Sequence, residues 1–128
     1  MSNLLKGRKV LIVDDFREMR VSLRGMMKKL WADHVDEAGD AADALACMGG
    51  TVYDVVLCDY NLGDGKDGMQ LFEEARHLGL LPVGAAFVMI TAETGMDNVM
   101  AVVEHLPDGY LVKPVNPEVL RLRLERAL

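Results

Sequence analysis

The sequence predicts an α/β protein built on one open, doubly wound parallel sheet of five strands with helices on both faces. Short β-branched runs alternate along the chain with segments whose apolar residues recur every three or four positions, and this is the pattern of strands alternating with amphipathic helices. The 128 residues are 51% apolar, which is enough for one domain around one core. We therefore expect residues 1–128 to form a single domain.

The first half of the chain contains three predicted strands and two predicted helices. Lys9 to Asp14 is a short β-branched strand, and apolar residues at helical spacing predict a helix over 16–30. His34 to Gly39 is a weaker strand. Asp40 is a favourable N-cap for the next helix, which two glycines end at 49 and 50. Tyr53 to Asp59 is continuous enough in apolar character to be buried on both faces of a sheet.

The second half continues the alternation. A helix starts near Asp67 and ends before Gly79, and strands are predicted over Ala86 to Thr91 and Gly109 to Val112. Between these two strands, Gly95 to Glu104 is a less regular helix. The pair Asn116-Pro117 supplies an N-cap and a first-turn proline for a last helix. For five strands of this kind the doubly wound order 2-1-3-4-5 is expected, with its switch point between strands one and three.

Polar residues follow four of the predicted strands. The carboxyl ends of parallel strands form one rim, and ligands bind in the crevice outside it. Three carboxylates, a hydroxyl and an ammonium would therefore meet there, a composition suited to a divalent cation and a phosphoryl group. These residues are Asp14 and Asp15 after KVLIV, Asp59 after DVVLC, Thr91 after FVMI and Lys113 after YLV.

Composition excludes several classes of function. The net charge of -6 disfavours nucleic-acid binding, and the apolar stretches are too short to cross a bilayer or act as a secretory signal, so we expect a cytoplasmic protein. Cys47 and Cys58 lack the spacing of a zinc or redox motif and are interpreted as reduced core residues. The local basic cluster has helical spacing and is interpreted as a solvated face; it comprises Arg17, Arg20, Arg24, Lys28 and Lys29.

In this order and spacing, the motifs V-D-D, L-C-D-Y, T-A and Y-L-V-K-P resemble the receiver domain of two-component response regulators, and the resemblance covers essentially the whole chain. It implies a flavodoxin-like (βα)5 fold in which Asp59 accepts a phosphoryl group from a sensor histidine kinase or a histidine phosphotransfer protein. It also implies a signalling domain that assists its own phosphotransfer and dephosphorylation, rather than an enzyme.

The resemblance assigns roles to the rim residues. Mg²⁺ would be bound by Asp14, Asp15 and Asp59 and by the backbone carbonyl of Asn61. In this family the first acid of the pair often binds the metal through a water molecule and the second binds it directly; here these would be Asp14 and Asp15. Mg²⁺ is needed because a phosphoryl group in transfer carries negative charge that repels the attacking carboxylate. Lys113 and the Thr91 hydroxyl would contact phosphoryl oxygens.

Signal output is also implied by the resemblance. Thr91 would move toward the phosphoryl group while Tyr110 turns inward, shifting the face formed by helix four, strand five and helix five toward a downstream effector domain or protein, or toward a homodimer. Asn61 and Glu93 occupy positions that tune dephosphorylation, and because both are polar we expect fairly fast self-dephosphorylation. Tyr110 as an ordinary strand aromatic, and Asn61 and Glu93 as solvated loop residues, remain open alternatives.

One segment departs from the family pattern. Where most receivers have Met-Pro and then Asp-Gly, this chain has the glycine-rich loop Gly63–Gly68 with one extra residue, and the added glycines loosen the geometry of the Asn61 carbonyl. Similar loops occur in some multidomain regulators. This is a hint that the chain is a fragment, such as the N-terminal part of a longer regulator, and a single-domain regulator is the open alternative. The resemblance also predicts a cis peptide bond between Lys113 and Pro114.

Three other classes of function compete with the receiver interpretation. A haloacid-dehalogenase-type phosphatase needs a D-x-D motif, which Asp14-Asp15 lacks. A flavin-binding flavodoxin would need Gly, Ser or Thr in the first turn, where this chain has acids. A phosphorylation-independent receiver-like binding module remains the alternative.

Overall fold

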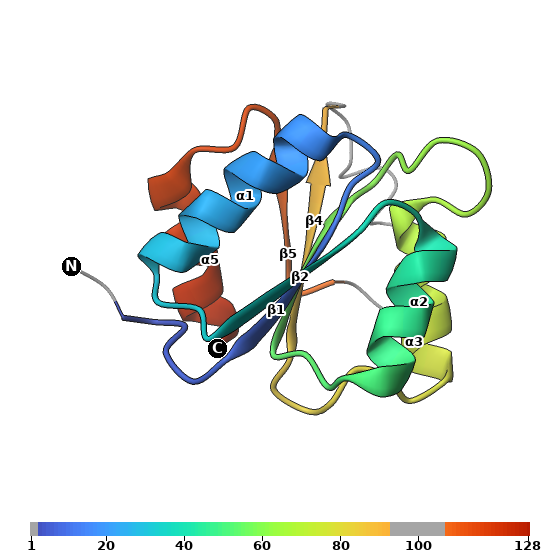
Figure 1. The fold of residues 1–128 in the computed structure, drawn as a ribbon, viewed down its shortest axis with the longest axis horizontal. Helices are drawn as coiled ribbons and strands as arrows, with labels where there is room; N and C mark the ends of the chain where they lie inside the picture. The colour runs from blue at the N-terminus through green and yellow to red at the C-terminus, as the bar shows by residue number, and fades with distance from the viewer. Residues whose placement is uncertain (1–2, 93–106) are drawn as a thin grey trace.

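The computed structural model describes residues 3–92 and 107–128, drawn in colour in Figure 1. Five parallel strands form one sheet in the order β2-β1-β3-β4-β5. The strands are β1 Lys9–Val13, β2 His34–Ala38, β3 Val55–Asp59, β4 Ala86–Thr91 and β5 Gly109–Val112. The helices are α1 Arg17–Lys29, α2 Ala41–Gly50, α3 Gly68–His77 and α5 Pro117–Ala127. The helix predicted over Gly95 to Glu104 lies outside the described residues.

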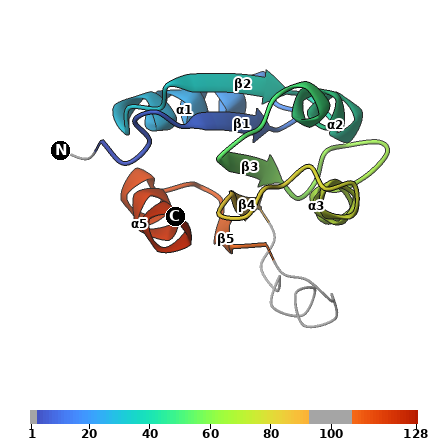
Figure 2. The ribbon, with the colours of Figure 1, turned by 90° about the horizontal axis from the view of Figure 1, so that it is seen from below.

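The four described helices cover both faces of the sheet. Figures 1 and 2 show α1 and α5 on one face and α2 and α3 on the other. Each face has its own apolar cluster, and Leu23, Met27, Leu120 and Leu124 anchor the first pair of helices. Phe72 of α3 packs on Phe87 of β4 with ring centroids 4.8 Å apart. The predicted doubly wound fold and strand order are confirmed.

The central strands owe their place to continuous apolar runs. Every residue of β3 and of β4 is buried, as expected of strands covered on both faces. Strand β3 begins at Val55, two residues later than the sequence predicted. The residue before it, Asp54, bonds to the first residue of β1 through its side chain as well as its backbone. Its carboxylate accepts a hydrogen bond from the Lys9 amide at 2.9 Å, and its own amide donates to the Lys9 carbonyl.

Helix starts follow the predicted caps. The carboxylate of Asp40 accepts from the Asp43 amide, and the side chain of Asn116 accepts from the first amides of α5. Asp67 and Gln70 form a reciprocal capping box at the start of α3. These local bonds fix where each helix leaves the rim of the sheet.

The end of α1 shows an unusual backbone. Trp31 follows the helix with φ of 71°, a left-handed conformation that is costly for a residue with a bulky side chain, and it is 58% exposed. The amides of Trp31 and Ala32 donate to carbonyls of the last turn, so the residue ends the helix. No helix among residues 3–92 and 107–128 is long and apolar enough to span a bilayer.

The basic face of α1 corrects the sequence interpretation. Arg17, Lys28 and Lys29 are exposed as expected, but Arg20 and Arg24 are only half-exposed and form ion pairs with Glu37 of β2. The reason is that Glu37 lies on the side of the edge strand that α1 covers. Both cysteines are free, and Cys58 is buried.

Candidate functional site

The rim of the sheet brings three carboxylates together. Strands β1 and β3 are neighbours with Val13 opposite Cys58, so Asp14 and Asp59 leave the sheet side by side. One oxygen from each of Asp14, Asp15 and Asp59 lies within 4.8 Å of the others. Asp14 and Asp59 are buried and Asp15 is exposed, so the cluster opens to solvent on the Asp15 side. Such a group of oxygen donors fits a hard cation such as Mg²⁺.

Asp14 is the most buried of the three, at 1% exposure. One carboxylate oxygen accepts from the Phe16 amide at 2.8 Å, and the other lies 3.3 Å from the Lys113 ammonium. Burial raises the pKa of Asp14 above its usual value, and the nearby negative charge of Asp59 adds to this, while the Phe16 amide and Lys113 act against it. The charged form of Asp14 is therefore held at a cost when no cation is bound.

Asp59 lies at the end of β3 and is 5% exposed. Its Oδ1 accepts from the Asn61 amide at 3.1 Å, and its Oδ2 lies 2.9 Å from Lys113 Nζ. Each oxygen therefore has a donor, and the carboxylate is fixed in one orientation. A carboxylate that is held in place and paired with one cation has the geometry required for attack on an electrophilic centre.

Lys113, which follows the edge strand β5, forms ion pairs with both buried carboxylates, Asp14 and Asp59. Its amide donates to the Thr91 carbonyl at 2.7 Å, which extends the pairing of β4 with β5. Burial acts to lower the pKa of Lys113, but the hydrogen bond to Asp59 and the charges of Asp59 and Asp14 outweigh it, so the pKa is raised. The peptide bond to Pro114 is cis, as predicted.

The glycine-rich loop after β3 runs beside the exposed Asp15 carboxylate. Gly63 and Gly65 have φ of 79° and 92°, which glycine adopts without steric cost. A Cβ on Gly63 would lie 3.4 Å from Asp15 Oδ2, so this loop runs against the exposed carboxylate. The side-chain oxygen of Asn61 accepts from the Gly63 amide at 3.0 Å, and this bond ties the side chain to its own loop.

The remaining predicted residues lie at different distances from this centre. Thr91 is buried at 2% exposure at the end of β4, on the same rim as Asp59. Tyr110 is half-buried on β5 and packs against the cluster beneath α2 and α3. Glu93 lies outside the described residues. The structure thus brings Asp14, Asp15, Asp59 and Lys113 together and places Thr91 on the same rim.

Two features of the site were missed from the sequence. A Cβ on Gly68 would lie 2.4 Å from the Asp59 carbonyl oxygen and 2.8 Å from Met89 Sδ, so only glycine fits behind the end of β3. Arg20 donates to the Asp14 carbonyl at 2.7 Å and is held by Glu37. The acid Glu37 inside a predicted strand was the available signal for this ion pair.

Comparison with known proteins agrees with this geometry. The response regulator receiver domain family matches residues 10–125. The chain is 32% identical over 129 residues to the chemotaxis protein CheY-3 of Vibrio cholerae, covering 96% of this chain and 93% of that protein. It is also 32% identical over 121 residues to the chemotaxis protein CheY of Pseudomonas aeruginosa, covering 92% and 94% of the two chains.

Solved structures show the same fold. The chemotaxis response regulator CheY4 of Vibrio cholerae superposes with a TM-score of 0.81 at 29% identity, covering 94% of this chain and 98% of that one. A CheY-like receiver domain from Methanospirillum hungatei gives a TM-score of 0.77 at 27% identity, covering 94% and 95%. The protein belongs to the response regulator receiver domain family. It is a CheY-like signalling domain of the kind used in two-component systems, not a classical enzyme.

Proposed function

We propose that Asp59 is the phosphoacceptor of this receiver. One carboxylate oxygen attacks the phosphorus of a phosphohistidine on a sensor histidine kinase or a histidine phosphotransfer protein, the P–N bond breaks, and the imidazole leaves. The observation that carries the proposal is the buried Asp59 carboxylate, 2.9 Å from Lys113 and clustered with two further carboxylates. Carboxylates of this kind form aspartyl phosphates.

The donor set supports Mg²⁺ as the cofactor. Three carboxylates lie together, and the Lys113 ammonium balances only one of their negative charges. The proposed ligands are Asp14, Asp15 and Asp59 together with the backbone carbonyl of Asn61. Bound there, Mg²⁺ supplies positive charge that offsets the repulsion between the carboxylates and an incoming phosphoryl group.

Lys113 and Thr91 act on the phosphoryl group in this proposal. Lys113 Nζ already contacts Asp59 Oδ2, so its point charge lies where a phosphoryl oxygen would be added. Thr91 ends the adjacent strand β4, and its hydroxyl donates to another phosphoryl oxygen. Aligned donors at the position where charge develops stabilise the transition state more than donors that must reorient.

The signal is proposed to pass through Thr91 and Tyr110 to the β5–α5 side. A cleft of about 600 Å³ on that side is lined by Tyr110, Val112, Val119 and Arg123, among others. A partner that binds one packing of Tyr110 better than the other would couple phosphorylation to binding. The segment Gly95 to Glu104, predicted to complete this face, lies outside the described residues. Tyr110→Ala should weaken binding of an effector or of a second copy while leaving Asp59 phosphorylation intact.

Lifetime and context complete the proposal. Asn61 and Glu93 are proposed to set a fairly fast loss of the phosphoryl group, and substituting either should change the decay rate of the aspartyl phosphate. We further propose that residues 1–128 form one receiver domain and that the protein is cytoplasmic. The domain can serve as the N-terminal part of a longer regulator. An effector domain or protein would receive its signal.

The test is phosphorylation by a small donor. The protein is incubated with Mg²⁺ and acetyl phosphate, and its intact mass is measured beside Asp59→Asn and beside Asp64→Asn, an exposed acid in the neighbouring loop. We expect gain of one base-labile phosphoryl group that needs Mg²⁺ and is lost only in Asp59→Asn. A folded protein that gains none would instead be a phosphorylation-independent binding module.

A further inference from the structure

Arg20 connects helix α1 to the backbone of the acidic loop, Asp14-Asp15, which follows β1. It lies in the first turn of α1, and its Nη1 donates to the carbonyl oxygen of Asp14 at 2.7 Å. Its Nε donates to Glu37 Oε1 at 3.1 Å. A guanidinium presents its donors in a fixed fork, so the two bonds hold the Asp14 carbonyl in a definite relation to β2.

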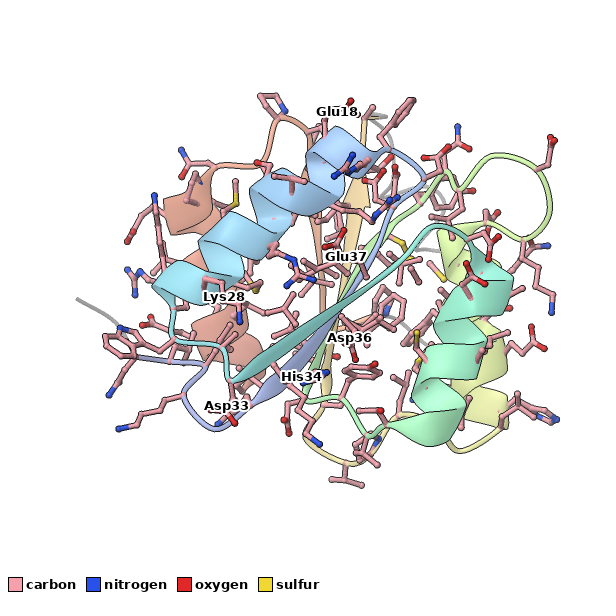
Figure 3. The ribbon with its side chains drawn as sticks, in the orientation of Figure 1. Glu18, Lys28, Asp33, His34, Asp36 and Glu37 are labelled. Carbon is pink, nitrogen blue, oxygen red and sulfur yellow. The ribbon has the colours of Figure 1, made fainter. Side chains whose placement is uncertain are left out.

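Glu37 is itself fixed from a second side. It lies on the α1 side of β2, while Asp36 lies on the α2 side, as Figure 3 shows. Its other oxygen accepts from Arg24 Nε at 2.7 Å, and Arg24 also donates to the Val35 carbonyl at 3.0 Å. Burial acts to raise the pKa of Glu37, but the hydrogen bonds and charges of Arg24 and Arg20 outweigh it and lower the pKa. Glu37 therefore stays charged and holds Arg20.

Both ends of the Asp14 residue are tied to other elements. Its amide donates to the Ala38 carbonyl of β2 at 3.1 Å, and its carbonyl accepts from Arg20. That carbonyl belongs to the peptide group that joins Asp14 to Asp15, so its orientation sets the direction from which the exposed Asp15 carboxylate faces the cluster. Groups that orient metal ligands without touching the metal commonly change metal affinity ten- to a hundredfold when removed.

We propose that Arg20, held by Glu37, is a positioning residue for the divalent-cation site: its bond to the Asp14 carbonyl orients the Asp14-Asp15 peptide so that both carboxylates face Asp59. The inference rests on the proposed Mg²⁺ function and adds to it a residue outside the ligand set. It makes cation affinity depend on an ion pair that lies on the outer side of the acidic loop, between β2 and α1.

Charge and position predict opposite results when Arg20 is removed. A guanidinium beside the acidic loop repels a divalent cation, so loss of its charge alone would tighten cation binding. Loss of its positioning bond would weaken cation binding, because Asp15 is then free to adopt other directions. The sign of the change therefore separates a positioning role from an electrostatic one.

The test compares matched arginine substitutions on the same helix. Mg²⁺ affinity of the full chain is measured by calorimetric titration for the unchanged protein, Arg20→Met and Arg24→Met, and urea unfolding without metal is measured for each. Arg24 shares Glu37 but bonds Val35 rather than Asp14. We expect Arg20→Met to weaken Mg²⁺ binding about tenfold and Arg24→Met to leave it within about twofold, at similar cost to stability.

Each other outcome has a definite meaning. Equal or tighter Mg²⁺ binding by Arg20→Met, or an equal loss in Arg24→Met, overturns the positioning role and leaves the proposed function intact. An unchanged protein that binds no divalent cation overturns both. Should Arg20→Met fail to fold, Arg20→Lys provides the same test, because one ammonium keeps the charge but cannot reproduce the fork, and a severalfold loss is expected.

Discussion

The two loops that border the site are held in different ways. The short loop after β1, which contains Asp14 and Asp15, is fixed by other elements. The Asp14 amide donates a hydrogen bond to the Ala38 carbonyl of β2. Arg20 of α1 donates to the Asp14 carbonyl, and Lys113 after β5 pairs with the Asp14 carboxylate. The longer loop after β3 is held by the buried side chain of Leu62, by bonds within the loop and by a bond to the next helix. Within the loop, the side-chain oxygen of Asn61 accepts a hydrogen bond from the Gly63 amide. Lys66 forms an ion pair with Glu74 of α3.

The contrast shows where tertiary structure and where local structure set the geometry of the carboxylates. Changes far from the first loop in sequence should alter Asp14 and Asp15, because their partners come from three other elements. Changes within the second loop should act mainly on the loop itself, except where it contacts the site: the Asn61 amide donates to Asp59 Oδ1, and Gly63 lies against Asp15. The tightest contact is at Gly68, where the chain enters α3 behind β3 and the Gly68 amide donates to the Tyr60 carbonyl at 2.7 Å.

The largest expected effect comes from adding a methyl group at Gly68, where there is no room for one. In Gly68→Ala the new methyl group would meet the Asp59 carbonyl oxygen at 2.4 Å and the Tyr60 Cα at 3.0 Å, and backbone atoms cannot move aside cheaply. We expect a loss of about 3 kcal/mol in the free energy of unfolding, measured in urea.

The matched control for Gly68 is another helical glycine. Gly25 in α1 has no atom within 4 Å of a built Cβ, so Gly25→Ala should stabilise the protein by about 0.5–1 kcal/mol. A Gly68→Ala protein as stable as the unchanged one would show that β3 tolerates displacement and that the second loop is not anchored there.

The next effect separates stability from cation binding in the first loop. Because burial and the charge of Asp59 raise the pKa of Asp14, a neutral side chain should be better tolerated there than a charged one when no metal is present. We expect Asp14→Asn to raise the free energy of unfolding by about 1 kcal/mol without metal and to lose the stabilisation that added Mg²⁺ gives the unchanged protein. Thermal unfolding with and without Mg²⁺ measures both; a destabilised Asp14→Asn protein would contradict it.

The same contrast explains what the sequence could predict. The strand order, the cis bond at Pro114 and the helix caps follow from patterns within a few residues or from the family resemblance, and Asp14, Asp15, Asp59 and Lys113 were predicted together because each follows a strand. Their roles as ligands and acceptor stay predictions.

Contacts between elements were less accessible from sequence. The pairing of Arg20 and Arg24 with Glu37 depends on which face of an edge strand a helix covers. From helical periodicity alone, both arginines were predicted to be solvated. The closeness of Gly68 to Asp59 depends on the path of a loop with one residue more than the family pattern. Both are properties of the folded backbone rather than of local propensity.

A pair of substitutions sharpens the contrast inside the second loop. Gly63 and Gly65 both have positive φ, so alanine at either should cost about 1 kcal/mol of stability. Only Gly63 lies against Asp15, with 3.4 Å between a built Cβ and Oδ2. We therefore expect similar urea midpoints for Gly63→Ala and Gly65→Ala, but weaker Mg²⁺ binding in calorimetry for Gly63→Ala alone. Equal Mg²⁺ affinities would show that this loop does not constrain Asp15.

The smallest effect is a pH dependence at Lys113. Its folded pKa is raised above the ordinary value of 10.5, so the stability it contributes is fully present below pH 10.5 and is lost as the pH rises through the higher folded value. The difference in urea stability between the unchanged protein and Lys113→Gln should therefore stay constant from neutrality to pH 10.5 and shrink only in more alkaline solution. A difference that shrank between neutrality and pH 10.5 would contradict the assignment.

The position of Trp31 decides how this protein can be followed by optical spectroscopy. It is the one tryptophan in the chain, and helix α1, with 13 residues, separates it from the acidic loop by roughly 20 Å. Its emission should respond to unfolding but stay flat during a Mg²⁺ titration. A fluorophore that senses the carboxylate cluster has to be introduced, and Tyr60→Trp, directly after Asp59, is the natural place for it.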